Sequence, residues 1–197
     1  RQTHEDHLSN MRSQFRVAFF ICVCTLTSLL QAQPTRRALL IAVAEYAPGS
    51  GWPALASARD ADLLRGVLLR QGFAEKDIHT LRDSAATLAG IEQALKMLVE
   101  QTQPGDALLI HFSGHGQQVA DDNGDEADGY DEALVPYDSP MRFQAGVYEG
   151  ERLLRDDALG KHIRSLRQRL GTSGSVLVLL DACHSGTGLR GDAGAAV

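Results

Sequence analysis

The stretch Ser175-Val-Leu-Val-Leu-Leu-Asp-Ala-Cys-His-Ser-Gly186 runs from an apolar segment directly into an acid, a thiol, an imidazole, a hydroxyl and a glycine. Its apolar part, Val176 to Leu180, lacks the alternation that is typical of a strand with one solvent-facing side. This pattern predicts a strand buried on both faces, as in a parallel sheet. Because ligands bind beyond the carboxyl ends of such strands, we expect Asp181, Cys183 and Gly186 to lie at a functional edge.

A second stretch, Asp106-Ala-Leu-Leu-Ile-His-Phe-Ser-Gly-His-Gly116, has the same form, an apolar strand that stops at polar and glycine residues. If the two strands are parallel neighbours, His115 and Cys183 reach the same edge of the sheet. A cysteine becomes a strong nucleophile as its thiolate, and a nearby imidazole can accept the proton. We therefore expect a Cys-His pair, with the backbone N–H groups of Gly116 and Cys183 binding the developing oxyanion.

The rest of the chain predicts alternating strands and helices. We expect strands over 37–44 and 78–81, helices over 54–72, from Ser84 or Thr87 to about 102 and over 155–170, and short strands near 134–136 and 148–154. The β-α-β-α-β order indicates one α/β domain with a mostly parallel central sheet flanked by helices. A chain of 197 residues, 44% of them hydrophobic, is long enough to bury the core of one such domain.

The pattern of the amino-terminal residues predicts a leader. A polar extension covers 1–10, and Met11 is followed by basic residues and the apolar run 17–30, which predicts a signal peptide over 11–32. The run is shorter than the roughly 20 residues that span a bilayer. An uncleaved amino-terminal anchor and a buried helix stay open as alternatives. A signal peptide or an anchor would place the domain outside the cytoplasm, secreted or periplasmic.

Cysteine use and charge narrow the function classes. Two of the three cysteines, Cys22 and Cys24, lie in the leader, so a mature chain would keep Cys183 alone and form no internal disulfide. The alternative is a purely structural role, in which the cysteine is a small hydrophobic residue buried in the core. The chain carries 19 Lys and Arg against 25 Asp and Glu, a net charge of −6, and no basic patch that indicates nucleic acid.

Ser113-Gly-His-Gly116 and Asp181-Ala-Cys-His-Ser-Gly186 resemble the histidine and cysteine signatures of caspase-like peptidases, specifically metacaspases and their prokaryotic relatives in peptidase family C14. The resemblance implies a caspase-like three-layer sandwich, incomplete at the carboxyl terminus. The catalytic domain would cover 36–190 as the large-subunit part, and a glycine-rich linker would begin at 191–197. It implies a cysteine endopeptidase in which Cys183 and His115 are catalytic, and whose sheet is completed by the missing carboxyl-terminal part of the same chain.

The residue two positions before the cysteine indicates specificity. Animal caspases have Gln there, whereas Asp181 places the chain with metacaspases, which cleave after Arg or Lys. A carboxylate at this position would attract a cationic side chain and repel an acidic one. The resemblance adds Ser113 and an aspartate of the first helix, best matched by Asp60, for which a surface role stays open. Expected substrates are proteins or peptides with basic residues, and Arg190 is a candidate self-cleavage site.

The segment 121–132 holds seven carboxylates among its twelve residues. Metacaspases that need calcium bind it with an aspartate of this segment and an adjacent pair further on, which the resemblance maps to Asp131, Asp156 and Asp157. A fourth acidic ligand of the family is replaced here by Arg190. The expected chemistry requires no cofactor, and calcium as an activator and a merely solvated acidic loop, with Asp156 as a helix cap, both stay open.

Two other functions stay open beside the peptidase. One is a catalytically idle caspase-like module that binds partners, and the other is a peptide ligase that uses the same Cys-His chemistry. We do not favour a zinc pair of His111 and His115, or Ser185 as a serine nucleophile.

Overall fold

The computed structural model describes residues 33–184 except 122, 125, 127 and 128, so the predicted leader, the linker and Gly186 lie outside the described residues. The elements are β1 (Arg36–Ala42), α2 (Ser57–Arg70), β2 (Ile78–Arg82), α3 (Leu88–Gln101), β3 (Ala107–Ala120), β4 (Tyr130–Leu134), β5 (Leu154–Arg155), α4 (Asp156–Leu170) and β6 (Ser175–His184). Within this described part, no helix is long and apolar enough to cross a membrane.

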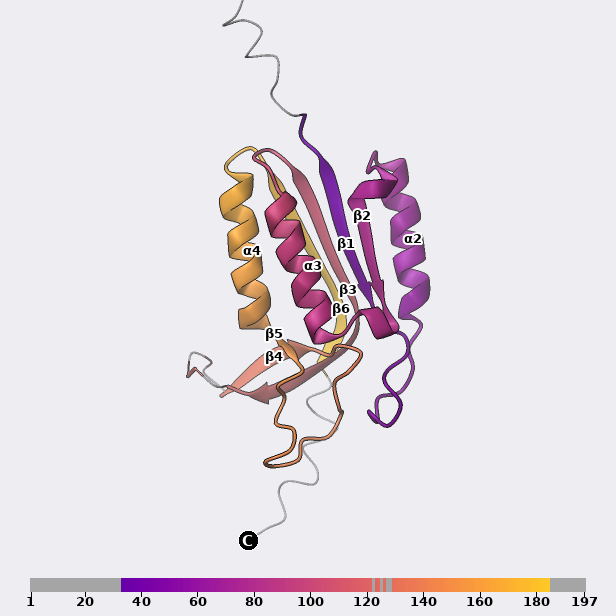
Figure 1. The fold of residues 1–197 in the computed structure, drawn as a ribbon, viewed down its shortest axis with the longest axis vertical. Helices are drawn as coiled ribbons and strands as arrows, with labels where there is room; N and C mark the ends of the chain where they lie inside the picture. The colour runs from indigo at the N-terminus through magenta and orange to yellow at the C-terminus, as the bar shows by residue number, and fades with distance from the viewer. Residues whose placement is uncertain (1–32, 122, 125, 127–128, 185–197) are drawn as a thin grey trace, which may run out of the picture. The chain divides into compact units, whose positions relative to one another are not determined.

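One mixed sheet organises the domain (Figure 1). Strands β2, β1, β3 and β6 are parallel to their neighbours, with β1 on one side of β3 and β6 as a further partner of β3. The carboxyl part of β3 pairs antiparallel with β4, which pairs antiparallel with β5. The prediction of a mostly parallel sheet flanked by helices is confirmed.

Alternate residues of the central strands serve two hydrophobic cores. Leu39 and Ile41 of β1 belong to the larger core, which α3 and α4 cover, whereas Ala38 and Leu40 belong to the smaller core under α2. This division follows from the two-residue repeat of a strand. It also explains why β1 is apolar from Ala38 to Ala42, since both faces of this part are buried.

Helix α3 begins where the sequence offers a cap. Thr87 is the residue before the helix, and its hydroxyl oxygen accepts a hydrogen bond from the Gly90 N–H at 3.1 Å. This is the usual N-cap arrangement, which satisfies a backbone donor that has no partner inside the helix. Of the two predicted caps, Ser84 and Thr87, the structure therefore selects Thr87.

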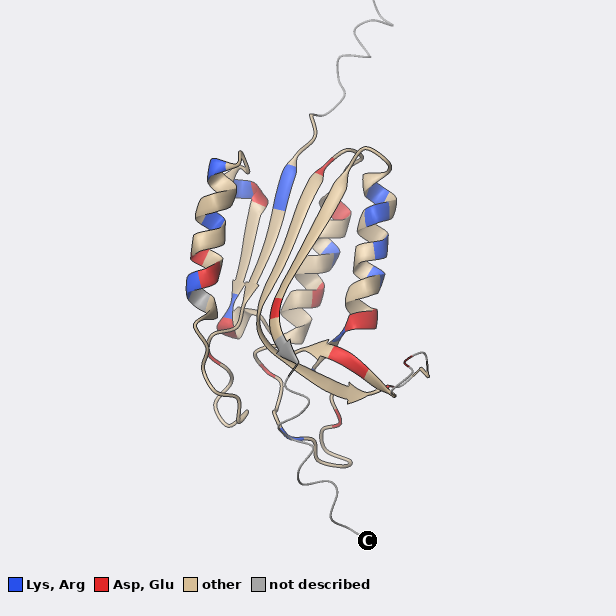
Figure 2. Ribbon diagram, turned by 180° about the vertical axis from the view of Figure 1, so that it is seen from behind, with Lys and Arg blue, Asp and Glu red and all other residues tan. Residues whose placement is uncertain are grey.

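The prediction that the strand before Cys183 is buried on both faces is wrong for the described residues. Leu177 and Leu180 of β6 are each 53% exposed, and Leu179 is 37% exposed. Figure 2 shows the reason: seen from behind, α2 lies at the β2 side of the sheet, and no described helix covers β6 on this face. An apolar run predicts that a strand is to be buried, but the run does not tell which part of a protein covers it.

The described residues of both motifs lie within strands instead of beyond them, which corrects a second expectation. Strand β3 continues through His115 to Ala120, because its residues from Gly116 onward find a second partner in β4. Strand β6 likewise includes Asp181 and the backbone of Cys183. The short strands are also displaced, to β4 and to the two residues of β5.

A buried ion pair fastens the amino ends of β1 and β3. Asp106 is 2% exposed and accepts hydrogen bonds from Arg37 Nη1 at 2.7 Å, the Thr35 N–H at 2.7 Å and the Gln103 N–H at 2.9 Å. Its carboxylate thus serves three donors from two segments that are distant in the sequence. Such a group is hard to remove, because its partners would stay buried without an acceptor.

We expect Asp106→Ala to lower the free energy of unfolding of the full-length protein by about 3–5 kcal/mol, as is typical when one partner of a buried pair is removed. Urea unfolding would measure the change. Asp62→Ala is the control, because Asp62 is 65% exposed and its pair with Arg82 should contribute less than about 1 kcal/mol. Equal losses in the two variants would contradict a special role of the buried pair.

Candidate active site

The backbone register brings the two motifs together. His115 and Cys183 are directly paired Cα partners of β3 and β6, and Ser113 and Asp181 are paired two residues earlier. The prediction that these strands are parallel neighbours is confirmed. The side chain of Cys183 lies outside what the structure describes, so its catalytic role stays a prediction that this register supports.

The imidazole of His115 is held by a backbone carbonyl. Its Nε2 lies 3.0 Å from the carbonyl oxygen of Pro53. A carbonyl can only accept a hydrogen bond, so we assign the hydrogen to Nε2, which leaves Nδ1 of the neutral ring as the proton acceptor. The contact therefore selects the tautomer that a general base needs, and it fixes the ring orientation.

Two aromatic rings pack against the same imidazole. The Trp52 ring is stacked on His115 with ring centroids 4.8 Å apart, and the Tyr46 ring lies at 5.3 Å. The Tyr46 hydroxyl also accepts a hydrogen bond from the His115 N–H at 2.8 Å. This approach requires the glycine of the motif, because a Cβ at Gly114 would lie 2.9 Å from the Phe112 ring and 3.2 Å from the Tyr46 oxygen.

Burial raises the pKa of Tyr46 to about 12, against the lowering effect of its hydrogen bond from the His115 backbone. The phenol therefore stays neutral at physiological pH. The loop that carries Tyr46 is itself anchored, since Asp83 accepts the N–H groups of Ala44 and Glu45 at 2.8 Å each. A rigid loop of this kind is suited to position a catalytic ring.

The sequence did not single out Tyr46, Trp52 and Pro53, which lie between the expected strand over 37–44 and the expected helix over 54–72. A signal was available: the loop follows a parallel strand, and it holds the single tryptophan of the chain. Loops at the carboxyl ends of parallel strands lie at the edge where such sheets bind ligands. The three contacts with His115 themselves span more than 60 residues and leave no trace in local periodicity.

We expect Trp52→Leu to lower kcat about 10-fold while KM changes little, because a loosened imidazole meets the nucleophile in the right geometry less often. Trp52→Phe keeps an aromatic face and should recover most of the rate. Steady-state kinetics of the full-length variants, with circular dichroism to check folding, would measure this. Equal kcat values in Trp52→Leu and the wild type would show that the stack does not position His115.

The three residues predicted to bind a basic side chain converge. Ser113 Oγ lies 3.4 Å from Asp60 Oδ2 and donates a hydrogen bond to it, although the two residues belong to β3 and to the first turn of α2. Asp181 is the register partner of Ser113. Asp60 and Asp181 also line one groove of about 400 Å³, whose walls are Leu63, Leu64, Val67, His111, Leu179 and Leu180. The contact with Ser113 favours a pocket role for Asp60 over a surface role.

Gly116 lies inside a strand. It is buried and is paired with Leu134 of β4 and His184 of β6. The expectation that the strand stops at these polar and glycine residues is therefore wrong, because β3 continues to Ala120. The role of Gly116 in binding an oxyanion stays a prediction.

Asp131, the first of the three calcium ligands that the resemblance implies, already has a cationic partner. Asp131 is 2% exposed, and its carboxylate accepts a hydrogen bond from Arg155 Nη1, which also donates to the Ala120 carbonyl at 2.9 Å. The guanidinium therefore supplies the positive charge that a buried carboxylate requires.

The acidic pair at the start of α4 is close by. Partial burial raises the pKa of Asp156, and the negative charges of Asp131 and Asp157 add to the rise. Asp157 accepts a hydrogen bond from Asn123 Nδ2 at 2.6 Å, and Asp156 Oδ1 accepts the Asp157 N–H at 2.9 Å. Over the described ranges, no three metal-ligating side chains gather in one place.

The acidic loop also satisfies its own backbone. Asp121 Oδ1 accepts the N–H groups of Asn123 and Gly124 at 2.8 Å each, and Oδ2 accepts the Glu126 N–H at 3.1 Å. The bonds from Gly124 and Asn123 lower the pKa of Asp121. As these residues are placed, they do not fit a calcium ion, because Arg155 would repel a second cation beside Asp131.

Comparison with known proteins agrees with this geometry. The family model "Metacaspase, peptidase C14 domain" matches residues 36–191. Metacaspase-1 of Mycosarcoma maydis is 34% identical over 163 residues, which cover 80% of this chain and 37% of that protein. Metacaspase III c of Phaeodactylum tricornutum is 35% identical over 161 residues, covering 79% of this chain and 44% of that protein.

Metacaspase-3 of Arabidopsis thaliana is 38% identical over 135 residues, covering 65% of this chain and 34% of that protein. A crystal structure of a Geobacter sulfurreducens protein matches with a TM-score of 0.60 and 30% identity, over 78% of this chain and 52% of that one. The chain spans less than half the length of these three curated metacaspases. Its sheet flanked by helices is a caspase-like fold. The chain belongs to the metacaspase family, with a peptidase C14 domain over residues 36–191.

Proposed function

We propose that the full-length protein is a cysteine endopeptidase that cleaves proteins or peptides after Arg or Lys. The observation that carries this proposal is the register of β3 and β6, which pairs Cys183 with the oriented base His115. The Cys183 thiolate attacks the scissile carbonyl carbon, and His115 delivers the proton to the leaving amine. Water, activated by the same imidazole, then hydrolyses the acyl-enzyme and restores the thiol.

The basic specificity rests on charge. Asp60 and Asp181 place two carboxylates on one groove, and none of the arginines and lysines that the structure describes lines it. A guanidinium or ammonium group would be attracted there, whereas an acidic side chain would be repelled. Ser113 supports Asp60 through its hydroxyl and thereby orients one of the two charges.

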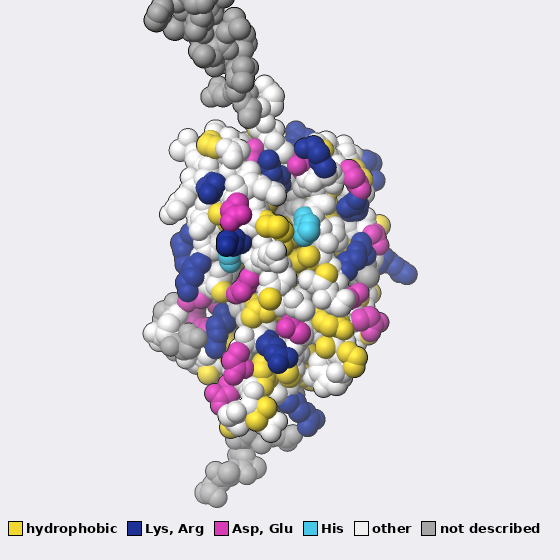
Figure 3. All heavy atoms as spheres, viewed as in Figure 1, with side chains coloured by type: hydrophobic (Ala, Val, Ile, Leu, Met, Phe, Trp, Pro, Cys, Tyr) yellow, Lys and Arg dark blue, Asp and Glu magenta, His cyan; other side chains and the backbone are white. Residues whose placement is uncertain are grey.

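We also propose that the domain acts outside the cytoplasm, on the basis of the leader over 11–32, and that no nucleic acid is a partner. On the face over α3 and α4, cationic and acidic side chains are mixed (Figure 3), which gives no single-sign surface for a polyanion. The carboxyl-terminal part of the same chain is the proposed cover of the exposed leucines of β6. The cut at Arg190 lies outside the described residues and stays a hypothesis, which mass spectrometry of the full-length protein would test.

The test is turnover of fluorogenic peptides that end in Arg, Lys or Asp by the full-length protein. We expect hydrolysis after Arg and Lys and none after Asp. Folded protein that turns over no peptide would favour an idle binding module. An excess of an amine nucleophile separates the remaining alternative, because a peptide ligase would convert the acid product into an amide.

We further propose that this domain does not need calcium, because Arg155 already neutralises Asp131. Arg155→Ala should lower the free energy of unfolding by about 3 kcal/mol, since a buried carboxylate loses its counter-charge. Millimolar calcium should then raise the melting temperature of this variant by about 3 °C or more and leave that of the wild type unchanged.

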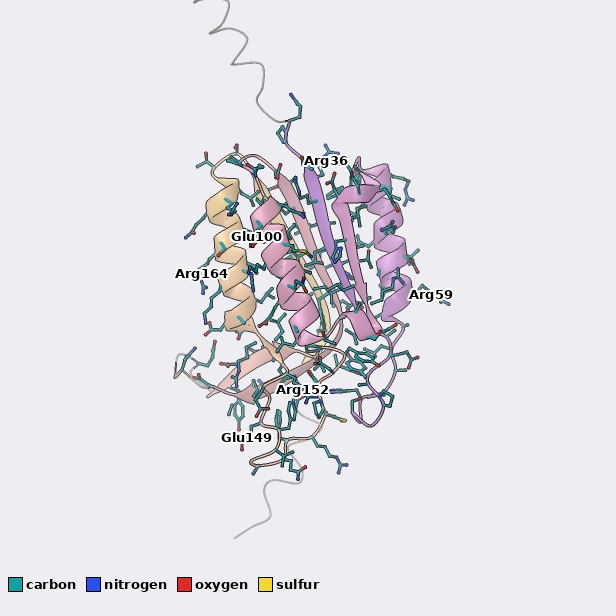
Figure 4. The ribbon with its side chains drawn as sticks, in the orientation of Figure 1. Arg36, Arg59, Glu100, Glu149, Arg152 and Arg164 are labelled. Atoms are coloured by element: carbon teal, nitrogen blue, oxygen red, sulfur yellow. The ribbon has the colours of Figure 1, made fainter. Side chains whose placement is uncertain are left out.

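Arg152→Ala is the matched control for this prediction. Arg152 lies in the loop before β5 (Figure 4). Its Nη1 donates a hydrogen bond to the Asp138 carbonyl at 3.1 Å and does not contact Asp131, Asp156 or Asp157. We expect neither a large loss of stability nor a calcium response in this variant. A wild-type protein that is stabilised by calcium, or whose activity requires it, would show that Asp131, Asp156 and Asp157 bind the ion in spite of Arg155.

A further inference from the structure

His111 lies at the inner wall of the groove that Asp60 and Asp181 flank. It belongs to β3, two residues before Ser113, and is 7% exposed. Its Nδ1 is buried and makes no hydrogen bond to any residue that the structure describes. A buried polar nitrogen without a partner is unfavourable. Because the ring lines a charged groove, a ligand bound there can supply the missing donor when the ring turns this nitrogen towards the groove.

We propose that neutral His111 accepts a hydrogen bond from the basic side chain of the substrate, and that protonation of His111 turns the pocket against such side chains. The inference rests on the proposed basic specificity and adds a third polar group and a pH control to that pocket. Guanidinium and ammonium groups carry only hydrogen-bond donors, so an unprotonated imidazole nitrogen complements them. A protonated imidazole offers no acceptor and adds a positive charge to the groove.

The surroundings of His111 set the range in which this control operates. Asp60 faces it from α2 and Asp181 from β6, whereas its register partner on β1 is the apolar Leu40. Burial lowers the pKa of His111, and the charges of Asp181 and Asp60 oppose this effect by raising it. The imidazole is therefore neutral at neutral pH and becomes protonated under acidic conditions.

A bound cation shifts this equilibrium further. A guanidinium in the groove disfavours a second positive charge on His111, so binding expels the proton from any protein in which the ring is protonated. By linkage, acid must then weaken the binding of the cation. Neutral ligands and ligands bound elsewhere should show no such dependence on His111.

The experiment measures binding of agmatine, which presents the guanidinium of arginine, to the full-length Cys183→Ala protein by calorimetry. We expect affinity to fall several-fold, and by no more than about 10-fold, between pH 7.5 and pH 5.5, because burial lowers the pKa of His111 from its usual 6.5. Measurements at pH 5.5 in two buffers of different ionisation enthalpy should show proton release. His111→Asn, which cannot titrate, should lose most of this pH dependence and the proton release.

His79→Asn is the matched control, because His79 is an exposed histidine of β2 outside the groove, and it should behave as the unmodified protein does. If agmatine binding depends on pH in His111→Asn as strongly as it does with His111 present, the role of His111 is refuted but the basic pocket is not. No agmatine binding at any pH would overturn the pocket as well. If His111→Asn fails to fold, NMR titration of the His111 ring decides: a midpoint that agmatine does not lower would overturn the proposal.

Discussion

Replacing Cys183 by alanine in the full-length protein is expected to lower kcat/KM for an arginine peptide by about 10⁴-fold or more, because the covalent step is lost with the thiolate. His115→Ala should cause a loss of the same order. Catalytic groups that act as one unit are strongly non-additive, so the double variant should be little worse than either single variant. Assays with a fluorogenic arginine peptide at saturating and limiting concentrations would measure kcat and KM separately.

The control for this prediction is Ser185→Ala, which removes the neighbouring hydroxyl and should keep the activity within about 2-fold, as expected for a residue outside the reacting pair. Circular dichroism would establish that each variant is folded. Full activity in Cys183→Ala, or its loss only in Ser185→Ala, would refute the cysteine mechanism. It would also leave the paired positions of His115 and Cys183 without a catalytic meaning.

Replacing Asp181 by asparagine is expected to lower kcat/KM for arginine peptides by about 100-fold, since loss of one partner of a close charge pair commonly weakens binding by 2–5 kcal/mol. Asparagine keeps the shape of the side chain and removes its charge. The loss should be larger for Arg and Lys peptides than for peptides with a neutral residue at the same position. Comparison of these substrates therefore separates specificity from general damage to the site.

Asp62→Asn is the matched control, because Asp62 lies on the same helix as Asp60, is 65% exposed and pairs with Arg82 away from the groove. Its kcat/KM should stay within about 2-fold of the wild-type value. A uniform loss for all peptides in Asp181→Asn would show that Asp181 supports the cysteine strand instead of selecting the substrate. Unchanged arginine specificity would remove Asp181 from the pocket.

The expected calcium ligands come from the family resemblance, which does not describe all of their surroundings. The resemblance identified Asp131, Asp156 and Asp157, and the charges of Asp131 and Asp157 do act on Asp156 at the start of α4. It did not include Arg155, the residue directly before the acidic pair, whose guanidinium binds Asp131. A residue-by-residue match to ligands therefore misses a cation that the chain itself supplies.

The sequence by itself determined the elements and the meeting of the two motifs. Apolar runs of strand length separated by helical periodicity predict parallel strands, and parallel strands necessarily bring their carboxyl ends to one edge. For this reason the arrival of His115 and Cys183 at one edge of the sheet could be predicted without coordinates, whereas Ser113 and Asp181 were placed together only by the family resemblance. Local patterns suffice when the topology is set by strand direction alone.

Only the tertiary structure decided how these residues are supported. The Pro53 carbonyl and the Trp52 ring on His115, the guanidinium on Asp131, the exposed face of β6 and the buried nitrogen of His111 all depend on contacts between distant segments. Such contacts arise from close packing and from the need to partner buried polar groups, which are properties of the folded interior. Sequence periodicity predicts which side chains are buried, but only the folded structure determines which residues each of them contacts.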